Sequence, residues 1–158
     1  MPIPNSRFPL AAAFLTLAAV LASASAQSAQ DRESNSLYQR LGGLAPISLV
    51  VSDLIDVLLS DPELNRNPAV AAARDRVPAP YLKFQVTAQL CEATGGPCKY
   101  TGRGMKEAHA HLNITAGEWQ RMIVLLKQVL SKHQVPAQES QELLDIVNAT
   151  KADIVTRP

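Results

Sequence analysis

Residues 95–112 decide the fold, and they read Gly95-Gly96-Pro97-Cys98-Lys99-Tyr100-Thr101-Gly102-Arg103-Gly104-Met105-Lys106-Glu107-Ala108-His109-Ala110-His111-Leu112. A glycine-rich loop is followed by a short predicted helix, on which Met105, Ala108, His109 and Leu112 share one face. His109 therefore faces inward, with no carboxylate on the same stripe. Such an imidazole suits an axial iron ligand better than a general base, although the periodicity alone also fits a hydrogen-bonded core histidine.

Helical patterns extend from this stretch in both directions. Asn35 or Ser36 can cap a short helix over 37–41, Pro80 can occupy the first turn of a helix that includes 81–94, and Thr115 with Glu118 forms a capping box. A long apolar helix is predicted to include Ile47 to Leu59 and to end near Asp61-Pro62, a possible helix extends from Ala69 to Arg76, and Pro136 begins the last helix. No segment alternates convincingly like a strand, so the predicted fold class is all-α. The expected inward positions include Ile47, Val50, Val51, Leu54, Leu58, Leu59, Trp119, Met122, Ile123, Leu126, Val129, Leu130, Leu143, Leu144, Val147 and Ile154.

The N-terminus has the layout of a secretory signal peptide over residues 1–26. Arg7 precedes an apolar run over 10–21, and Ala24-Ser25-Ala26 is a small-residue cleavage pattern. An uncleaved anchor is the alternative, but the run is short for a membrane span. Residues 27–35 then form a polar, flexible leader, and residues 36–158 form one domain. The expected destination is the periplasm, without stable membrane insertion after cleavage.

Charge and cysteine content exclude several classes of partner and site. Removing Arg7 from 15 basic residues leaves 14, which equals the 14 acidic residues, so nothing favours nucleic acid as a partner. Cys91 and Cys98 are the two cysteines, and in an exported protein they form either a disulfide or two separate buried thiols. The chain has no Cys-x-x-Cys-His pattern for covalent haem attachment and no cysteine–histidine spacing typical of zinc.

The chain resembles the group I truncated haemoglobins. Near the start, residues 37–43 read Leu37-Tyr38-Gln39-Arg40-Leu41-Gly42-Gly43, and later Gly95-Gly96-Pro97 precedes Tyr100-Thr101-Gly102-Arg103, Met105-Lys106, His109 and Ile114-Thr115. The resemblance extends from about Leu37 to Ile154. It implies a two-over-two helical sandwich holding non-covalent haem b, with His109 as the proximal iron ligand. Met105 and Lys106 are implied to lie beside the haem.

The other two histidines receive different interpretations. His111 is two positions from His109, a helical rotation of about 200°, so both should not face one pocket and His111 is expected in solvent. His133 is expected to stabilise the end of its helix through the helix dipole.

The predicted distal side departs from the family. Leu54 and Ile55 stand where the family usually carries an aromatic pair ending in a tyrosine that hydrogen-bonds the gas. Asn67-Pro68 replaces the usual haem-packing phenylalanine. Ile55, Leu82, Gln85 and Val86 are expected to shape the distal pocket. Gln85 is the best candidate donor and Gln89 a weaker one, although both also fit ordinary surface glutamines.

Aromatic and cationic side chains nearby have two interpretations as well. Phe84 and Tyr81 are candidate porphyrin contacts or simple interhelical packing. Lys83, Arg103 and Lys106 are candidate partners for haem propionates or solvated surface cations.

Three functions remain open at this point. The leading interpretation is an exported haem protein that reversibly binds O2, NO or CO and is not an enzyme. The second is nitric oxide dioxygenation, which requires a separate reductase partner. The third is a helical module that has kept the globin scaffold and lost haem.

Overall fold

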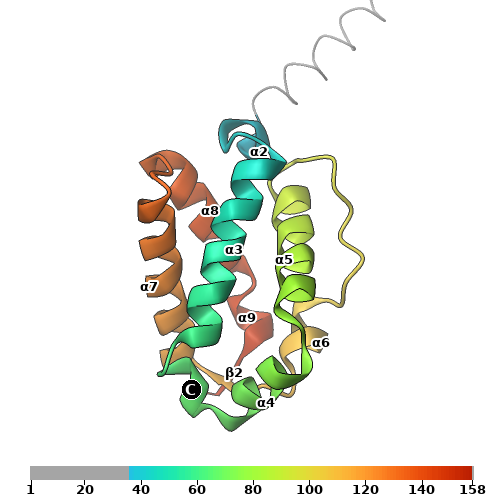
Figure 1. Ribbon diagram of the computed structural model, residues 1–158, viewed down its shortest axis with the longest axis vertical. Helices are drawn as coiled ribbons and strands as arrows, with labels where there is room; N and C mark the ends of the chain where they lie inside the picture. The colour runs from blue at the N-terminus through green and yellow to red at the C-terminus, as the bar shows by residue number, and fades with distance from the viewer. Residues whose placement is uncertain (1–35, 158) are drawn as a thin grey trace, which may run out of the picture. The chain divides into compact units, whose positions relative to one another are not determined.

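The computed structural model describes residues 36–157, so the predicted signal peptide (1–26) and leader (27–35) lie outside the described residues. In chain order, labelled as in Figure 1, the elements are α2 (Leu37–Arg40), α3 (Leu44–Ser60), η1 (Leu64–Arg66), α4 (Pro68–Arg76), α5 (Ala79–Ala93), α6 (Met105–His109), β1 (Ile114–Thr115), α7 (Ala116–Lys132), α8 (Ala137–Ala149), α9 (Lys151–Ile154) and β2 (Val155–Arg157). The all-α prediction is confirmed.

Local capping explains where several helices begin. The Ser36 hydroxyl accepts a hydrogen bond from the Gln39 amide at 3.3 Å, which identifies the cap of α2. At α7, Thr115 and Glu118 form the predicted capping box in both directions, at 3.1 and 2.7 Å. Gly43 precedes α3 with φ +83°, a conformation that other residues resist, and so allows the abrupt turn from α2.

The long helices form two layers (Figure 1). Helix α3 packs against α5 in one layer, α7 packs against α8 in the other, and α3 also contacts α7. The main core lies between the layers, and its buried members are Leu54, Trp119, Ile123, Leu126, Val129, Leu130, Leu143, Leu144 and Ile154. A smaller core of Ile47, Val51 and Ile55 lies on the α5 side of α3. The predicted two-over-two sandwich is therefore present.

The C-terminal region differs from prediction in two ways. Ile154 was expected on one continuous last helix, but α8 ends at Ala149 and Ile154 lies on the separate helix α9. A parallel pair, β1 with β2, was not expected at all; it pairs Ile114 with Val155. Strands of two and three residues are too short for alternating hydrophobicity to reveal them.

The cysteines form the disulfide that the sequence left open. Cys91, near the end of α5, is joined to Cys98 in the following loop, with 5.7 Å between their Cα atoms. Cys91 is completely buried. The covalent link therefore holds the loop after α5 against the helix that precedes it.

Within residues 36–157, no helix is both long enough and apolar enough to cross a membrane.

Candidate functional site

The larger of two cavities described in the structure has a volume of about 390 Å³, which suits a cofactor-sized ligand. Residues from the end of α3, from η1, α4, α5, α6 and α7, and from the loop over 95–104 form its walls. The lining is mostly apolar and includes Leu58, Leu64, Leu82, Leu112, Trp119 and Met122. A flat apolar group with a few polar substituents would match such a lining.

His109 lies in the wall of this cavity and is half-buried. Its Nδ1 atom lies 2.9 Å from the Met105 carbonyl oxygen. A carbonyl can only accept, so Nδ1 carries the hydrogen, and in a neutral imidazole Nε2 then holds the lone pair. Within the described residues, Nε2 has no hydrogen-bond partner. The ring therefore has the tautomer that a metal ligand through Nε2 requires.

The surroundings of His109 also keep its imidazole neutral. Burial lowers the pKa of His109, and the positive charges of His111 and Arg103 lower it further, against the opposing effect of the Met105 hydrogen bond. A neutral ring offers its lone pair at neutral pH, whereas a protonated ring does not.

His111 is exposed, as predicted. It also lines the large cavity together with His109, so the prediction that the two cannot share one pocket is wrong. Because an exposed residue contributes to its wall, the cavity reaches the molecular surface at His111.

Gln85, a polar residue of α5, lies in the wall of the cavity. Leu82 of the same helix also lines the cavity. The Gln85 Oε1 atom is buried and has no hydrogen-bond partner in the described part of the chain. An unpaired buried amide is costly in an empty cavity, so its position fits a bound group that can satisfy it.

Five other residues predicted for this site lie outside the cavity lining. Ile55 is buried in the smaller core, and Val86 packs against that core from α5. Phe84 is 67% exposed on the outer side of α5. Met105 packs against the main core, and Lys106 is exposed. Each was placed by its position in the family pattern, and the geometry of this chain puts them elsewhere.

The structure adds lining residues that the sequence did not reveal, mainly Asn65, Arg74, Tyr100 and Glu118. Arg103, a predicted propionate partner, does line the cavity. The only earlier signal for Tyr100 was its place in the glycine-rich stretch. The others come from irregular segments or polar helix faces, where periodicity gives no direction.

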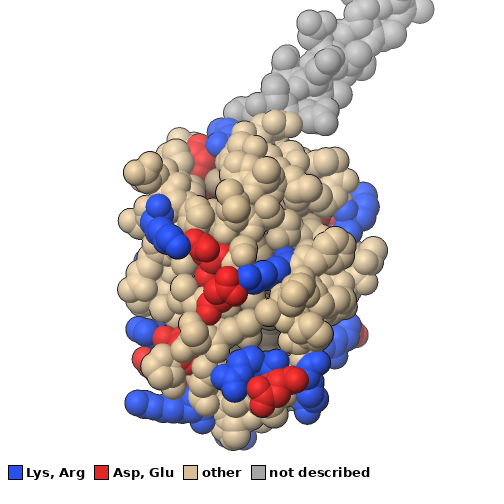
Figure 2. All heavy atoms as spheres, in the orientation of Figure 1, with Lys and Arg blue, Asp and Glu red and all other residues tan. Residues whose placement is uncertain are grey.

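Lys83, by contrast, is directed away from this site. Its Nζ atom lies 2.7 Å from Asp56 Oδ2, a carboxylate of α3. Also on α3, Asp53 accepts from Lys132 at 2.6 Å and from His133 at 2.8 Å. On the face shown in Figure 2, acidic groups accordingly gather over the middle of α3 between basic groups. These pairs fasten α3 to its neighbouring helices.

Asn67 stands where the family pattern has its haem-packing phenylalanine. Its Oδ1 caps α4 by accepting from the Ala69 amide at 2.9 Å. Its Nδ2 donates to the Leu112 carbonyl at 2.9 Å, 45 residues along the chain. Asn67 therefore joins the start of α4 to the segment that follows His109, a polar link in place of an aromatic contact.

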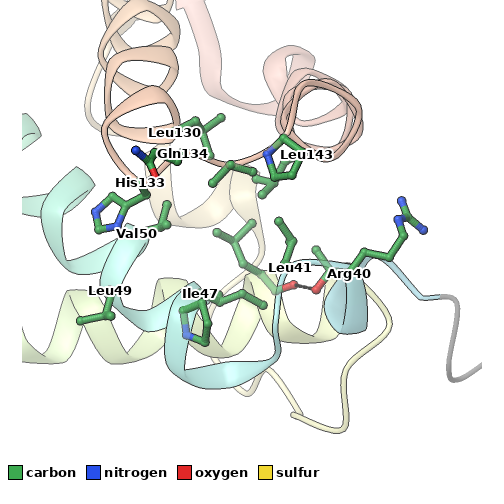
Figure 3. Close-up of a pocket in the computed structure, with 14 residues that line it drawn as sticks. Arg40, Leu41, Ile47, Leu49, Val50, Leu130, His133, Gln134 and Leu143 are labelled. Atoms are coloured by element: carbon green, nitrogen blue, oxygen red, sulfur yellow. Dashed lines mark hydrogen bonds between the residues drawn. The ribbon is translucent and has the colours of Figure 1, made fainter.

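A second cavity of about 240 Å³ lies at the α2 end of the layers (Figure 3). Leu41, Val50, Leu130 and Leu143 are among its lining residues. Arg40 at its edge is hydrogen-bonded to Glu139 at 3.1 Å and to Glu142, and these bonds hold α2 against α8. His133 was predicted to act through the helix dipole; it does cap α7, and its specific partner is Asp53. Arg40 and His133 are thus both paired with carboxylates outside the lining of this cavity.

A helical sandwich with an inward histidine in the wall of a large apolar cavity defines a globin of the truncated kind. The bacterial-like globin family matches residues 36–156, and the chain belongs to this family. The predicted family resemblance is confirmed. Globins in general are haem proteins that bind diatomic gases.

Individual relatives agree with this assignment. The chain is similar to the group 1 truncated hemoglobin GlbN of Mycolicibacterium paratuberculosis, with 27% identity over 124 residues that cover 78% of this chain and 87% of that protein. It is also similar to the crystal structure of truncated hemoglobin from Tetrahymena pyriformis in the Fe(III) form, with a TM-score of 0.67 and 23% identity. That match covers 77% of this chain and 98% of the other, and it concerns the fold alone.

Proposed function

We propose that this chain binds haem b without covalent attachment in the large cavity, with His109 as the proximal ligand, and that it reversibly binds a diatomic gas on the opposite side. The observation that carries the proposal is the His109 ring, whose Nδ1 is held by Met105 and whose Nε2 is unpaired among the described residues. When bound, haem would supply an iron atom that can hold a gas molecule. His109 would hold that iron, and the apolar walls would exclude water.

Gln85 is the residue we assign to the gas side of the pocket. It lines the cavity from α5, and its buried Oε1 has no partner in residues 36–157. A glutamine amide has both donor and acceptor atoms, and the NH2 group can donate to a gas ligand once the side chain turns. A single neutral hydrogen bond contributes only about 1 kcal/mol, so Gln85 alone would stabilise polarised O2 weakly. Because the rest of the pocket is mostly apolar, we expect CO or NO to be favoured over O2. We assign gas binding rather than catalysis, because Ile55 replaces the tyrosine that polarises the gas in the family.

The test is a spectrum of the protein reconstituted with haem. The wild-type chain is expected to bind haem in a 1:1 ratio with a globin-like Soret band. His109→Ala should abolish or strongly alter this band, and added imidazole should restore it by filling the vacated space. His133→Ala is the control, because His133 does not line this cavity, and it should leave the spectrum unchanged.

Two results would contradict this assignment. An unchanged spectrum in His109→Ala would show that another residue binds the iron. A colourless wild-type protein of normal helical content would favour the haem-free alternative.

We further propose that the chain is exported to the periplasm. The support is the sequence of residues 1–26, with Arg7, the apolar run over 10–21 and the small residues Ala24-Ser25-Ala26. The full gene expressed in a Gram-negative host should give a periplasmic protein whose first residue is Gln27, as read by mass spectrometry. Full-length protein in the membrane fraction would instead indicate an uncleaved anchor.

A further inference from the structure

The loop between α5 and α6 forms one wall of the large cavity. In Figure 1 it runs from the end of α5 along the outside of that helix to α6. Tyr100, Gly102 and Arg103 of this loop line the cavity. A group held in the cavity can therefore be released when this segment moves away.

The loop has little regular structure of its own to hold it in place. Within the described residues, the segment 97–103 makes no backbone–backbone hydrogen bond. Its ties to α5 are made by side chains. The Glu92 carboxylate accepts from the Tyr100 amide at 3.0 Å and pairs with Lys99 at 3.5 Å. The third tie is the covalent one, between Cys91 and Cys98.

The loop is nevertheless folded tightly. A Cβ atom on Gly96 would lie 2.5 Å from the Tyr38 ring and 2.7 Å from the Cys91 carbonyl oxygen. A Cβ on Gly102 would lie 2.4 Å from the Tyr100 ring, whose hydroxyl donates to the Arg103 carbonyl at 2.8 Å. These contacts require one specific path of the chain, and the disulfide fixes that path two residues before Tyr100.

We propose that the Cys91–Cys98 disulfide is a positioning element of the haem site, holding the loop over 95–104 closed and so slowing the release of haem. This inference rests on the proposed function. Without the disulfide, the polar ties of the segment 97–103 to α5, among the described residues, are the contacts of Glu92 with Tyr100 and Lys99. Longer unconstrained segments gain more entropy on opening, so the open state becomes more populated.

The experiment measures the rate at which haem passes from the protein to an excess of a haem-scavenging apoglobin. The full chain is compared with the double variant Cys91→Ala/Cys98→Ala. We expect release roughly tenfold faster from the variant, with an unchanged Soret maximum because His109 is untouched. Glu92→Gln keeps the disulfide and weakens the Tyr100 tie, so it should accelerate release by a smaller factor, about twofold to threefold.

A matched control separates loop closure from general stability. Asp53→Asn breaks the ion pairs of α3 with Lys132 and His133, and none of these three residues lines the large cavity. It should lower the unfolding temperature and leave haem release unchanged. Amide hydrogen exchange of Tyr100 in the haem-free protein should be faster in the double variant and unchanged in Asp53→Asn.

The outcomes distinguish this inference from the proposed function. If the wild-type chain binds haem but the double variant and Glu92→Gln release it at the wild-type rate, the inference is overturned and the haem assignment stands. Release that follows the unfolding temperature in all variants, including Asp53→Asn, also overturns it. If the wild-type chain binds no haem, both proposals fail.

Discussion

At His109 the chemistry depends on which ring nitrogen carries the hydrogen. The Met105 carbonyl fixes that hydrogen on Nδ1, at 2.9 Å, and burial keeps the ring neutral by lowering the pKa of His109. The same carbonyl fixes the direction of the ring, because it lies one turn earlier on the short helix α6. The contact with Met105 therefore sets the tautomer and the direction of the ring, whereas burial favours its neutral state.

This arrangement predicts an acid limit to haem binding. The folded-state pKa of His109 is below the ordinary value of about 6.5, so the unfolded chain binds more protons as the pH falls below that value. The stabilisation from His109 is fully present above about pH 6.5 and is lost as the pH falls through its folded pKa. A Soret titration should show haem release on acidification.

Mutation of His111 gives a second test of what lowers the pKa of His109. In haem-free protein, His111→Ala should raise the pKa of His109, followed by NMR, because a neighbouring positive charge is removed. A lowered or unchanged pKa would contradict the account of the site.

Replacing Gln85 with leucine should have opposite effects on stability and on gas binding. Gln85→Leu removes a buried amide oxygen without a partner, so the haem-free protein should gain about 1 kcal/mol in its free energy of unfolding. In the haem-bound protein the same change should speed gas dissociation several-fold, as measured by flash photolysis. Gln89→Leu is the control, since Gln89 is on the same helix but not in the cavity lining, and it should change neither quantity.

The sequence predicted His109 because that residue lies inside an ordered run of residue types on a helical face. The same reasoning placed His111 correctly in solvent but missed that the cavity wall extends to it. Tyr100 and Arg74 were not predicted as lining residues. An irregular loop and a short helix without an apolar stripe give no periodic signal of which side chain faces a cavity.

At the scale of elements, one buried carboxylate joins the two layers next to the site. Asp61 follows α3, and its Oδ1 accepts from the amides of Glu63 and Leu64 at 3.1 and 3.0 Å. Its Oδ2 accepts from Arg121 of α7 at 2.7 Å. Leu64 lines the large cavity, so this ion pair holds part of the cavity wall.

Mutation of Asp61 should therefore lower the stability of the fold by an amount that depends on pH. Asp61→Asn should lower the free energy of unfolding by about 2 kcal/mol at neutral pH, because the charge-assisted bond to Arg121 is lost. Arg121 lowers the pKa of Asp61, so the wild-type advantage is present above about pH 3.9 and disappears as the pH falls through the folded pKa. Urea denaturation of the two proteins at neutral and acid pH measures the difference in their free energy of unfolding. An equal difference at both pH values would contradict this prediction.

The long helices were predictable because the spacing of their apolar residues and the residue types at their ends indicate the same segments. Helices α3, α5 and α7 have apolar stripes together with glycine, proline or capping signals at their ends. The β1–β2 pair has no such local signal, since its partners are far apart in sequence. Likewise, the break at Thr150 between α8 and α9 follows from tertiary contacts of α9 with α6 rather than from a helix-breaking residue.

For the whole molecule, haem binding and folding should be linked. A ligand present at about a thousand times its dissociation constant stabilises the folded state by roughly 4 kcal/mol, which raises the unfolding temperature by roughly ten degrees for a domain of this size. Differential scanning calorimetry with and without haem measures the shift. His109→Ala should show a much smaller shift, and an equal shift would mean that haem binds without that histidine.

The pairing of β1 with β2 has a consequence for the order in which this protein is made. Ile154 lines the large cavity, and Val155 next to it is paired with Ile114. Ile154 is the most C-terminal residue of the cavity wall, so translation delivers it after every other lining residue. A nascent chain that has not yet reached β2 therefore has an unfinished cavity, whatever follows β2 in the chain.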